Sequence, residues 1–265
     1  MSATTPLPPP PAQAVLLESY LRRLRLPAML AAYPKLVQEA AQAGLTYEQF
    51  LLTLVEHEVT QRDENMQRRR IAAARFPALK TLDQYDFSLM PALTKQLVLE
   101  LAQGHYIAAK ENILCVGEIG TGKTHTATAL GISACRQGYR VRFVTAAGLA
   151  NELLEAHAAH RLSRVEQALL RLHLLILDEV GFVPFTKLGA DLLFSVLSAL
   201  HERVRLILTT TVPFADWAQL FGGDQRLAGA LLDRLTFHAH LLHFAGDSFR
   251  LRHSLQQQEA ERRRR

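Results

Sequence analysis

The sequence has few cysteines and no long hydrophobic run, which argues against a disulfide-rich protein and a membrane-spanning protein. Its 265 residues include two cysteines, Cys115 and Cys135. One falls in a predicted strand and the other in a predicted helix, which argues against a disulfide framework and fits a reducing compartment. No uncharged apolar run reaches the roughly 18 residues of a membrane-spanning helix, and residues 1–13 lack the basic and apolar regions of a signal peptide. We therefore expect a cytoplasmic protein that engages no membrane.

The sequence also lacks a repeat at a fixed period, a zinc-ligand spacing and a series of stacking aromatics. These absences argue against solenoids, zinc fingers and base-stacking modes of nucleic-acid recognition. The composition is 49% hydrophobic and 21% charged, as in globular proteins, and the net charge of +5 gives a modest attraction for polyanions. Four histidines are scattered without cysteine partners, so core or surface positions explain them better than a metal site: His201, His238, His240 and His243.

Hydrophobic periodicity divides the chain into a small helical region and a larger α/β region. Thr46 and Gln49 have the spacing of a capping box at the start of a helix, and Pro77 ends the same helical run because it excludes helical geometry at Phe76. The expected organisation is a proline-rich, extended lead-in at 1–13, a helical N-terminal domain at 14–78, an α/β domain at 79–253 and a basic tail at 254–265.

Four short apolar runs alternate with helical stretches in the larger region. Such alternation is typical of an α/β fold with a parallel sheet flanked by helices. The predicted strands cover residues 113–116, 141–144, 174–177 and 206–210.

The first predicted strand leads into a phosphate-binding loop. The segment matches G-x-x-x-x-G-K-[ST] and is followed by a helical run, which is the setting of a P-loop NTPase and argues against an accidental glycine-rich turn. Glycines let the backbone N–H groups point at phosphate oxygens. We expect Lys123 to reach the β and γ phosphates of ATP, and the Thr124 hydroxyl to ligate Mg²⁺. The predicted binding residues are Gly117, Glu118, Ile119, Gly120, Thr121, Gly122, Lys123 and Thr124, followed by His125.

The third predicted strand ends in two acids, Asp178 and Glu179. The carboxyl ends of parallel strands open onto the ligand crevice. We expect Asp178 to hold the Mg²⁺ shell and Glu179 to orient and deprotonate the attacking water. The adjacent acids favour ATP hydrolysis over small-molecule kinase chemistry.

Taken together, seven segments resemble the IstB-like transposition helper ATPases, relatives of the DnaC helicase loaders in the AAA+ class. The resemblance extends from about residue 16 to 253. It implies an ATPase of bacterial insertion sequences that forms homo-oligomers on duplex DNA and delivers the site to a cognate transposase. The segments are residues 120–125, 138–141, 151–154, 175–179 and 232–235, and in the N-terminal domain 45–50 and 73–80.

The resemblance also implies roles for four further residues. Thr211 occupies a polar sensor position where the family usually has asparagine, and the shorter hydroxyl puts the hydrolysis rate in doubt more than ATP binding. Arg250 resembles a second sensor that touches the γ-phosphate. Arg226 and Arg234 are the candidates for an arginine finger given to a neighbouring subunit, and the sequence does not choose between them. Each of these arginines could instead have a structural role.

Two basic clusters are the candidate DNA contacts. With no base-reading motif present, the expected binding is to phosphates, largely independent of sequence and sensitive to salt. Nearby acids, such as Asp63 and Glu64, leave a solvated helix face as the alternative. The candidate residues are Arg22, Arg23, Arg25, Arg68, Arg69 and Arg70.

Three other functions remain open at this stage. A replicative helicase loader shares the ATPase motifs but prefers single-stranded DNA. An ATP-gated DNA-binding scaffold that hydrolyses little would fit the departure at Thr211, and a small-molecule kinase is disfavoured by Glu179.

Overall fold

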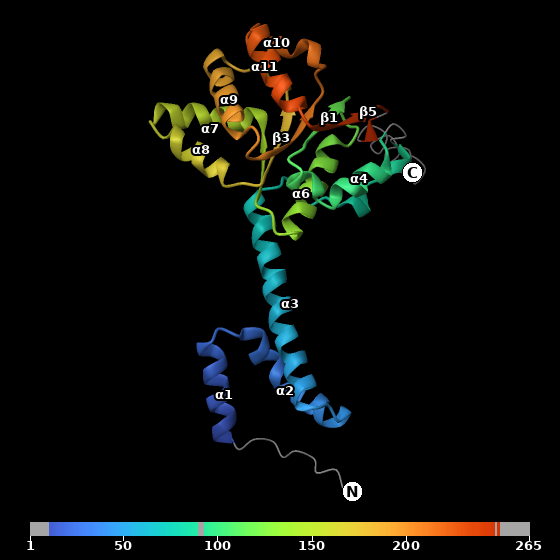
Figure 1. Cartoon of the computed structure of the whole chain (residues 1–265), viewed down its shortest axis with the longest axis vertical. Helices are drawn as coiled ribbons and strands as arrows, with labels where there is room; N and C mark the ends of the chain where they lie inside the picture. Colours follow the sequence, from blue (N-terminus) through green and yellow to red (C-terminus); the bar gives the residue numbers. More distant parts are fainter. Residues whose placement is uncertain (1–10, 90–92, 247, 250–265) are drawn as a thin grey trace, which may run out of the picture. The chain divides into compact units, whose positions relative to one another are not determined.

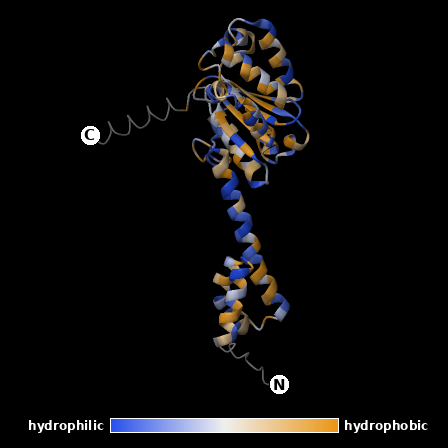
Figure 2. Cartoon of the chain, turned by 90° about the vertical axis from the view of Figure 1, so that its left-hand side faces the viewer, coloured by the Kyte–Doolittle hydropathy of each residue, from blue (hydrophilic) through white to orange (hydrophobic). Residues whose placement is uncertain are grey.

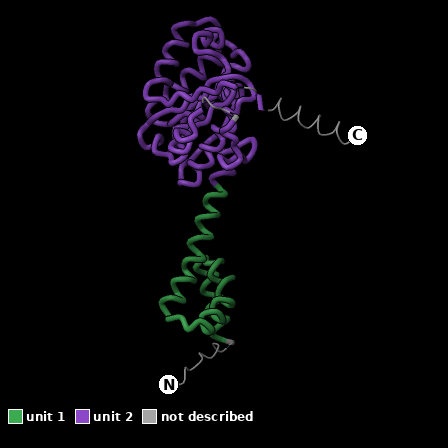
Figure 3. Tube along the Cα trace, turned by 90° about the vertical axis from the view of Figure 1, so that its right-hand side faces the viewer, with its two compact units in different colours: residues 1–69 green, residues 70–265 purple. Residues whose placement is uncertain are grey.

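The computed structural model describes residues 11–89, 93–246 and 248–249, which belong to two compact units (Figure 3). Unit 1 ends at Arg69 and unit 2 begins at Arg70. The division falls inside one helix, α3 (Tyr47–Ala74), whose last turn packs in the core of unit 2. The boundary between the units therefore lies before residue 78, where the sequence suggested a domain boundary. The two positions differ because helix α3 continues from unit 1 into unit 2.

The described part of unit 1 contains three helices, α1 (Pro11–Arg23), α2 (Pro27–Ala43) and the first part of α3. Helix α1 begins at Pro11, so the predicted extended lead-in is wrong for residues 11–13; proline is compatible with the first turn of a helix. The capping box before α3 is confirmed, with Gln49 N donating to Thr46 Oγ1 at 3.2 Å and Thr46 N to Gln49 Oε1 at 2.9 Å. A small core holds the helices together, with Leu21, Met29 and Leu54 buried.

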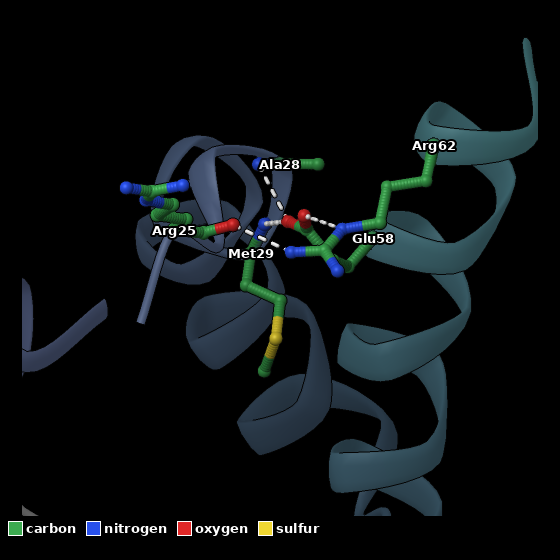
Figure 4. A network of polar contacts seen from close by, with 5 residues as sticks. All are labelled: Arg25, Ala28, Met29, Glu58 and Arg62. Carbon is green, nitrogen blue, oxygen red and sulfur yellow. Dashed lines mark hydrogen bonds and ion pairs between the residues drawn. The ribbon is translucent and has the colours of Figure 1, made fainter. Parts of the chain in front are cut away.

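A buried carboxylate also joins α2 to α3 (Figure 4). Glu58 Oε2 accepts hydrogen bonds from the first N–H groups of α2, Ala28 at 2.9 Å and Met29 at 3.1 Å. Arg62 donates to Glu58 Oε1 at 2.8 Å and to the carbonyl of Arg25 at 2.6 Å. Glu58 thus caps a helix from a distant part of the chain, where the positive end of the helix dipole favours an anion.

Unit 2 is built on a five-stranded sheet in the order β2-β3-β4-β1-β5. Every pairing in it is parallel, which confirms the α/β fold class. The four predicted strands are present, and the sequence prediction omitted the fifth. The strands are β1 (Asn112–Gly117), β2 (Val141–Thr145), β3 (Leu174–Val180), β4 (Arg205–Thr210) and β5 (Ala239–Phe244).

Helices cover both faces of the sheet and bury a separate core on each (Figure 1). Figure 2 shows the hydrophobic residues concentrated on the strands between these layers. One layer contains α4 (Lys95–Ala102), α5 (His105–Ala108) and α6 (Lys123–Arg136). The other contains α7 (Ala146–Ala158), α8 (Leu162–Leu170), α9 (Lys187–Leu200), α10 (Trp217–Leu220) and α11 (Gln225–Thr236). Short 3₁₀ turns occupy Leu82–Gln84, Phe87–Leu89 and Phe214–Asp216.

Both cysteines lie in this second unit and are buried and unpaired with each other, as the sequence predicted. Burial raises the pKa of Cys115 to about 12 and that of Cys135 to about 11. Among the described residues, no helix is long and apolar enough to cross a bilayer.

Candidate functional site

The predicted phosphate loop connects β1 to α6, as its sequence context indicated. Gly122, which caps the helix, has a φ of +95°, a backbone conformation that side chains disfavour. A Cβ at this position would also lie 2.7 Å from the Tyr85 ring. The loop therefore needs glycine here for both its curvature and its close neighbour. It presents the N-terminus of a 14-residue helix to one end of the sheet, which is a favourable site for an anion.

Lys123 is the first residue of α6 and is 8% exposed. Its Nζ donates to the carbonyl oxygens of Gly117 at 2.8 Å and Glu118 at 2.5 Å. The ammonium group is thus held inside the curl of the loop, among the backbone groups that would surround a phosphate.

Thr124 and Asp178, the two predicted Mg²⁺ ligands, are brought into direct contact. The Thr124 hydroxyl lies 3.0 Å and 3.1 Å from the two oxygens of Asp178, which is 3% exposed. Hard oxygen donors of this kind suit Mg²⁺, which takes few protein ligands and completes its shell with water and phosphate. The donor set therefore fits Mg²⁺, and the glycine loop with its lysine fits the triphosphate of ATP.

Glu179 follows Asp178 at an irregular point of β3, where the pairing with β4 shifts register. Its φ is +57°, and its exposed side chain lines the same cavity as the phosphate loop. Thr209 on the neighbouring strand supports both acids, because its hydroxyl donates to Asp178 Oδ1 at 2.5 Å and accepts from the Glu179 N–H at 2.9 Å. This bridge holds the Asp178 carboxylate beside Thr124, while the Glu179 side chain faces the cavity.

The cavity that contains these residues has a volume of about 360 Å³. The phosphate loop, the end of β4 and the segment before α4 surround it. Three exposed apolar side chains, Ile119, Phe182 and Phe249, contribute to its lining. A hollow of this size, partly apolar and with a few convergent polar groups, is typical of small-molecule sites.

Tyr85 forms a wall of the cavity beside the predicted residue His125. The two rings meet edge to face with centroids 5.2 Å apart, and the His125 ring bonds to the Thr81 carbonyl through Nε2 at 2.8 Å. Burial lowers the pKa of His125 and raises the pKa of Tyr85 to about 12, so both side chains are neutral near pH 7. The cavity therefore joins a side with the neutral rings of Tyr85 and His125 to a phosphate-binding side, which suits a nucleotide.

Thr211 lines the cavity and is exposed, so its hydroxyl is accessible from the site. Arg250, the other predicted sensor, lies outside the described residues.

The two finger candidates on α11 have different surroundings. Arg234 is half-buried, donates to Ser198 Oγ at 2.8 Å and lies over the Phe194 ring at 5.2 Å. Arg226 is exposed, and its side chain forms no hydrogen bond or ion pair with the described residues. Neither lines the cavity of its own chain, as expected of a group that acts on a neighbour.

The candidate DNA contacts are spread over unit 1 and the start of unit 2. Arg22 pairs with Glu18 and Arg68 with Glu64, in each case one helical turn away. The remaining exposed members are Arg23, Arg25 and Arg69, whereas Arg70 is half-buried. Exposed pairs of this kind are weak, so these arginines remain available to phosphates.

Sequence reasoning missed Tyr85 and Thr209. Tyr85 reaches the loop from 36 positions away in the sequence, and its hydroxyl lies 3.3 Å from the Thr121 carbonyl. Thr209 carried a weak signal, since it stands near the carboxyl end of a predicted strand, two residues before Thr211. The direction of its side chain, however, depends on the strand pairing.

Sequence comparison identifies relatives across most of the chain. The family described as IstB-like ATP binding protein matches residues 19–257. An insertion-sequence IS21 protein of Pseudomonas aeruginosa, whose name describes it as ATP-binding, is 38% identical over 236 residues, or 89% of each chain. An IS5376 protein of Geobacillus stearothermophilus with a similar name is 32% identical over 246 residues, covering 93% of this chain and 98% of the relative.

Solved structures share the fold of unit 2 at low sequence identity. DnaI superposes with a TM-score of 0.54 at 15% identity, over 67% of this chain and 94% of its own. AMPPCP-bound DnaA from Aquifex aeolicus gives a TM-score of 0.51 at 22% identity, over 65% of this chain and 52% of its own. These likenesses establish the P-loop, AAA+ type of fold.

Proposed function

The chain belongs to the IstB-like ATP-binding family, and from this premise we propose that it is an ATPase that assists transposition. It binds and hydrolyses ATP, forms a homo-oligomer on duplex DNA and delivers that DNA to a cognate transposase in the bacterial cytoplasm. The observation that carries the proposal is the convergence of Lys123, Thr124, Asp178 and Glu179 on one cavity. Insertion-sequence relatives at 38% and 32% identity support the transposition context.

Within this proposal, the loop residues bind and orient the nucleotide. When bound, ATP supplies the phosphoanhydride bond that is broken, and Mg²⁺ would help to neutralise the charge that develops on the phosphate oxygens. Lys123 and the backbone N–H groups of the loop would hold the phosphate oxygens, and Thr124 with Asp178 would hold the metal. Tyr85 and His125 would exclude water from the aromatic side of the cavity.

Glu179 acts as the base of the reaction. Its carboxylate accepts a proton from the attacking water and orients that water, while Thr209 fixes the backbone from which it projects. Arg226 or Arg234 of a neighbouring subunit would complete the site, which couples hydrolysis to assembly.

A scaffold that binds ATP and hydrolyses it slowly is the second candidate, favoured by one observation. Thr211 faces the cavity in the sensor position and has no amide with which to orient water. In that case ATP binding alone controls the DNA complex.

The proposal is tested by fluorescence anisotropy of labelled duplex and single-stranded DNA, with and without ATP·Mg²⁺. Wild type is expected to prefer duplex and to bind it more tightly with ATP, and Lys123→Ala to lose the gain from ATP. Preference for single strands would favour a helicase loader instead. The absence of binding to either DNA at moderate salt would contradict the DNA-binding part of the proposal.

A further inference from the structure

A second cavity, of about 340 Å³, lies at the edge of the sheet opposite the phosphate loop. Arg140 and Val141, at the start of β2, line it, whereas the loop follows the end of β1. Since all strands of the sheet are parallel, these two cavities lie at opposite ends of the strands. The second cavity is also at the side of the sheet, because β2 is an edge strand.

Four arginines from two stretches of the chain line this pocket: Arg70, Arg75, Arg140 and Arg142. All four belong to unit 2. We call this set the arginine pocket. Helix α3 supplies Arg70, and Arg75 directly follows that helix with a φ of +60°. The other two flank the beginning of β2.

Two of the four guanidinium groups already have partners. Arg142 forms a bidentate ion pair with Glu152 of α7, and its side chain is 18% exposed. Arg140 donates from Nε to the Arg171 carbonyl at 2.6 Å, an interaction that leaves its charge uncompensated. Both side chains are thus held in position at the pocket.

The other two arginines, Arg70 and Arg75, form no hydrogen bond or ion pair with the described residues. The Arg70 guanidinium lies near Gly138, where a Cβ would be 3.9 Å from its carbon, and the Arg75 side chain is exposed. Their ten N–H donors are available to a ligand, since each guanidinium carries about five.

The charges in the pocket do not balance. Four guanidinium groups face one carboxylate, that of Glu152, which leaves an excess of three positive charges (four minus one). Like charges gathered in a hollow repel one another, and a bound anion relieves that repulsion. The planar fork of arginine matches the oxygens of a phosphate in particular.

We propose that the arginine pocket binds the phosphate backbone of duplex DNA. The proposal rests on the DNA-binding function proposed above; Arg70 was already an expected contact, and Arg75, Arg140 and Arg142 of unit 2 are added to it. The lining has no aromatic ring on which a base could stack and no glycine loop for a nucleotide triphosphate, so a phosphodiester is the fitting ligand.

The test is a salt titration of duplex binding by fluorescence anisotropy, comparing wild type with the double variant Arg70→Gln/Arg75→Gln. These substitutions remove two charges without breaking an ion pair among the described residues. The double variant is expected to bind duplex about tenfold or more weakly. Its slope of log affinity against log salt should be smaller by about 0.9 for each phosphate that the variant no longer neutralises.

Arg203→Gln is the matched control, because Arg203 is also an exposed arginine of unit 2 but does not line the pocket. It should retain the wild-type affinity and slope. Binding of a fluorescent ATP analogue and the unfolding midpoint by Trp217 fluorescence report whether each variant is folded. Should the double variant unfold, Arg75→Gln alone, at an exposed position, is expected to show about half of the change in slope.

The outcomes separate this inference from the proposed function. If wild type binds duplex and the folded double variant does so with the same affinity and slope, the arginine pocket is not a DNA site, while the proposed function stands. If wild type binds no duplex, both fail. If the variant loses affinity for poly-glutamate but retains affinity for duplex, the pocket takes an acidic protein segment and the DNA assignment is overturned.

Discussion

The Thr209 hydroxyl is the residue-scale feature on which the geometry of both acids depends. It donates to Asp178 Oδ1 at 2.5 Å and accepts from the Glu179 N–H at 2.9 Å, and Thr209 is 1% exposed. Replacing it by valine keeps the volume but leaves one buried carboxylate oxygen and one backbone N–H without this partner. The loss of a hydrogen bond to a charged group costs about 1.5–3 kcal/mol.

We expect Thr209→Val to lower ATP turnover by about ten- to a hundredfold, which is the rate change that corresponds to an activation barrier higher by this hydrogen-bond energy. Affinity for ATP should change little, because Lys123 and the loop are untouched. Steady-state phosphate release and titration with a fluorescent ATP analogue measure the two effects. Thr209→Ser restores the hydroxyl and should recover most of the turnover; unchanged turnover in Thr209→Val would show that the bridge does not position the acids.

Among single residues, the sequence predicted the site residues that stand in short motifs. It missed those that tertiary packing brings to the site. Lys123, Thr124 and the two acids stand in short motifs with fixed chemistry, and the structure brings them to one cavity. Thr209, which contacts both acids, lies on the neighbouring strand β4. Its place in the site therefore depends on strand pairing and not on sequence spacing. Tyr85 likewise reaches the loop through tertiary packing.

Helix α11 places the two candidate finger arginines, Arg226 and Arg234, in different surroundings. Its 12-residue length places Arg226 in the first turn and Arg234 in the last. The first is exposed without an ion pair among the described residues, and the second bonds to Ser198 and lies over Phe194. Sequence alone left both as finger candidates, whereas these contacts favour Arg226 for the finger and a structural role for Arg234.

Arg226→Ala is therefore expected to lower turnover by about a thousandfold, a typical loss for an arginine finger, without changing the urea midpoint of unit 2. Arg234→Ala should instead lower the free energy of unfolding by about 1–2 kcal/mol, because it removes the hydrogen bond and the cation–π interaction. Phosphate release and unfolding by Trp217 fluorescence distinguish the two. The reverse pattern would assign the finger to Arg234.

In unit 1, the Glu58 carboxylate caps the N-terminus of helix α2. Burial acts to raise the pKa of Glu58, but hydrogen bonds from Met29, Arg62 and Ala28 outweigh it, so the pKa lies below its ordinary value. The folded state thus binds fewer protons than the unfolded state. The stabilisation is present above the unfolded pKa and is lost as the pH falls through the folded pKa.

Glu58→Gln should accordingly lower the free energy of unfolding of unit 1 by about 1 kcal/mol at pH 7, and the gap from wild type should close as the pH falls through the carboxyl range. Circular dichroism during urea unfolding follows both units. The single tryptophan, Trp217, belongs to unit 2, so its fluorescence should not change. Glu64→Gln, which removes an exposed ion pair with Arg68, is the control and should have little effect; an equal loss there, or one that is independent of pH, would contradict the cap.

Element prediction worked best where burial produces a continuous apolar run and least well elsewhere. β1, β3 and β4 are central strands, and their runs are readily recognised. β5 is an edge strand whose apolar run is broken by His240 and His243, with Leu242 and Phe244 as its buried residues, and it was missed. In α3, Leu54 is buried, whereas Tyr47, Leu51 and Val59 are exposed, because unit 1 packs few residues against that helix.

At the scale of the whole molecule, the chain combines an α/β unit of an ATP-binding family with a helical unit that has exposed apolar side chains. Val15, Leu16 and Leu24 on α1 and the segment after it, and Tyr47 and Leu51 on α3, are each more than half exposed. The division into two units was predictable from the change in periodicity, but its position inside a continuous helix was not.

The measurement that tests the central claim most directly is steady-state phosphate release from ATP by wild type and by Glu179→Gln, with and without duplex DNA. The account predicts turnover by wild type that duplex increases. It also predicts that Glu179→Gln binds the ATP analogue and duplex as wild type does while phosphate release falls at least a hundredfold, within the range for removal of a general base. Equal phosphate release by the two proteins, under conditions where both bind ATP and DNA, would contradict the ATPase mechanism and leave an ATP-gated scaffold as the function.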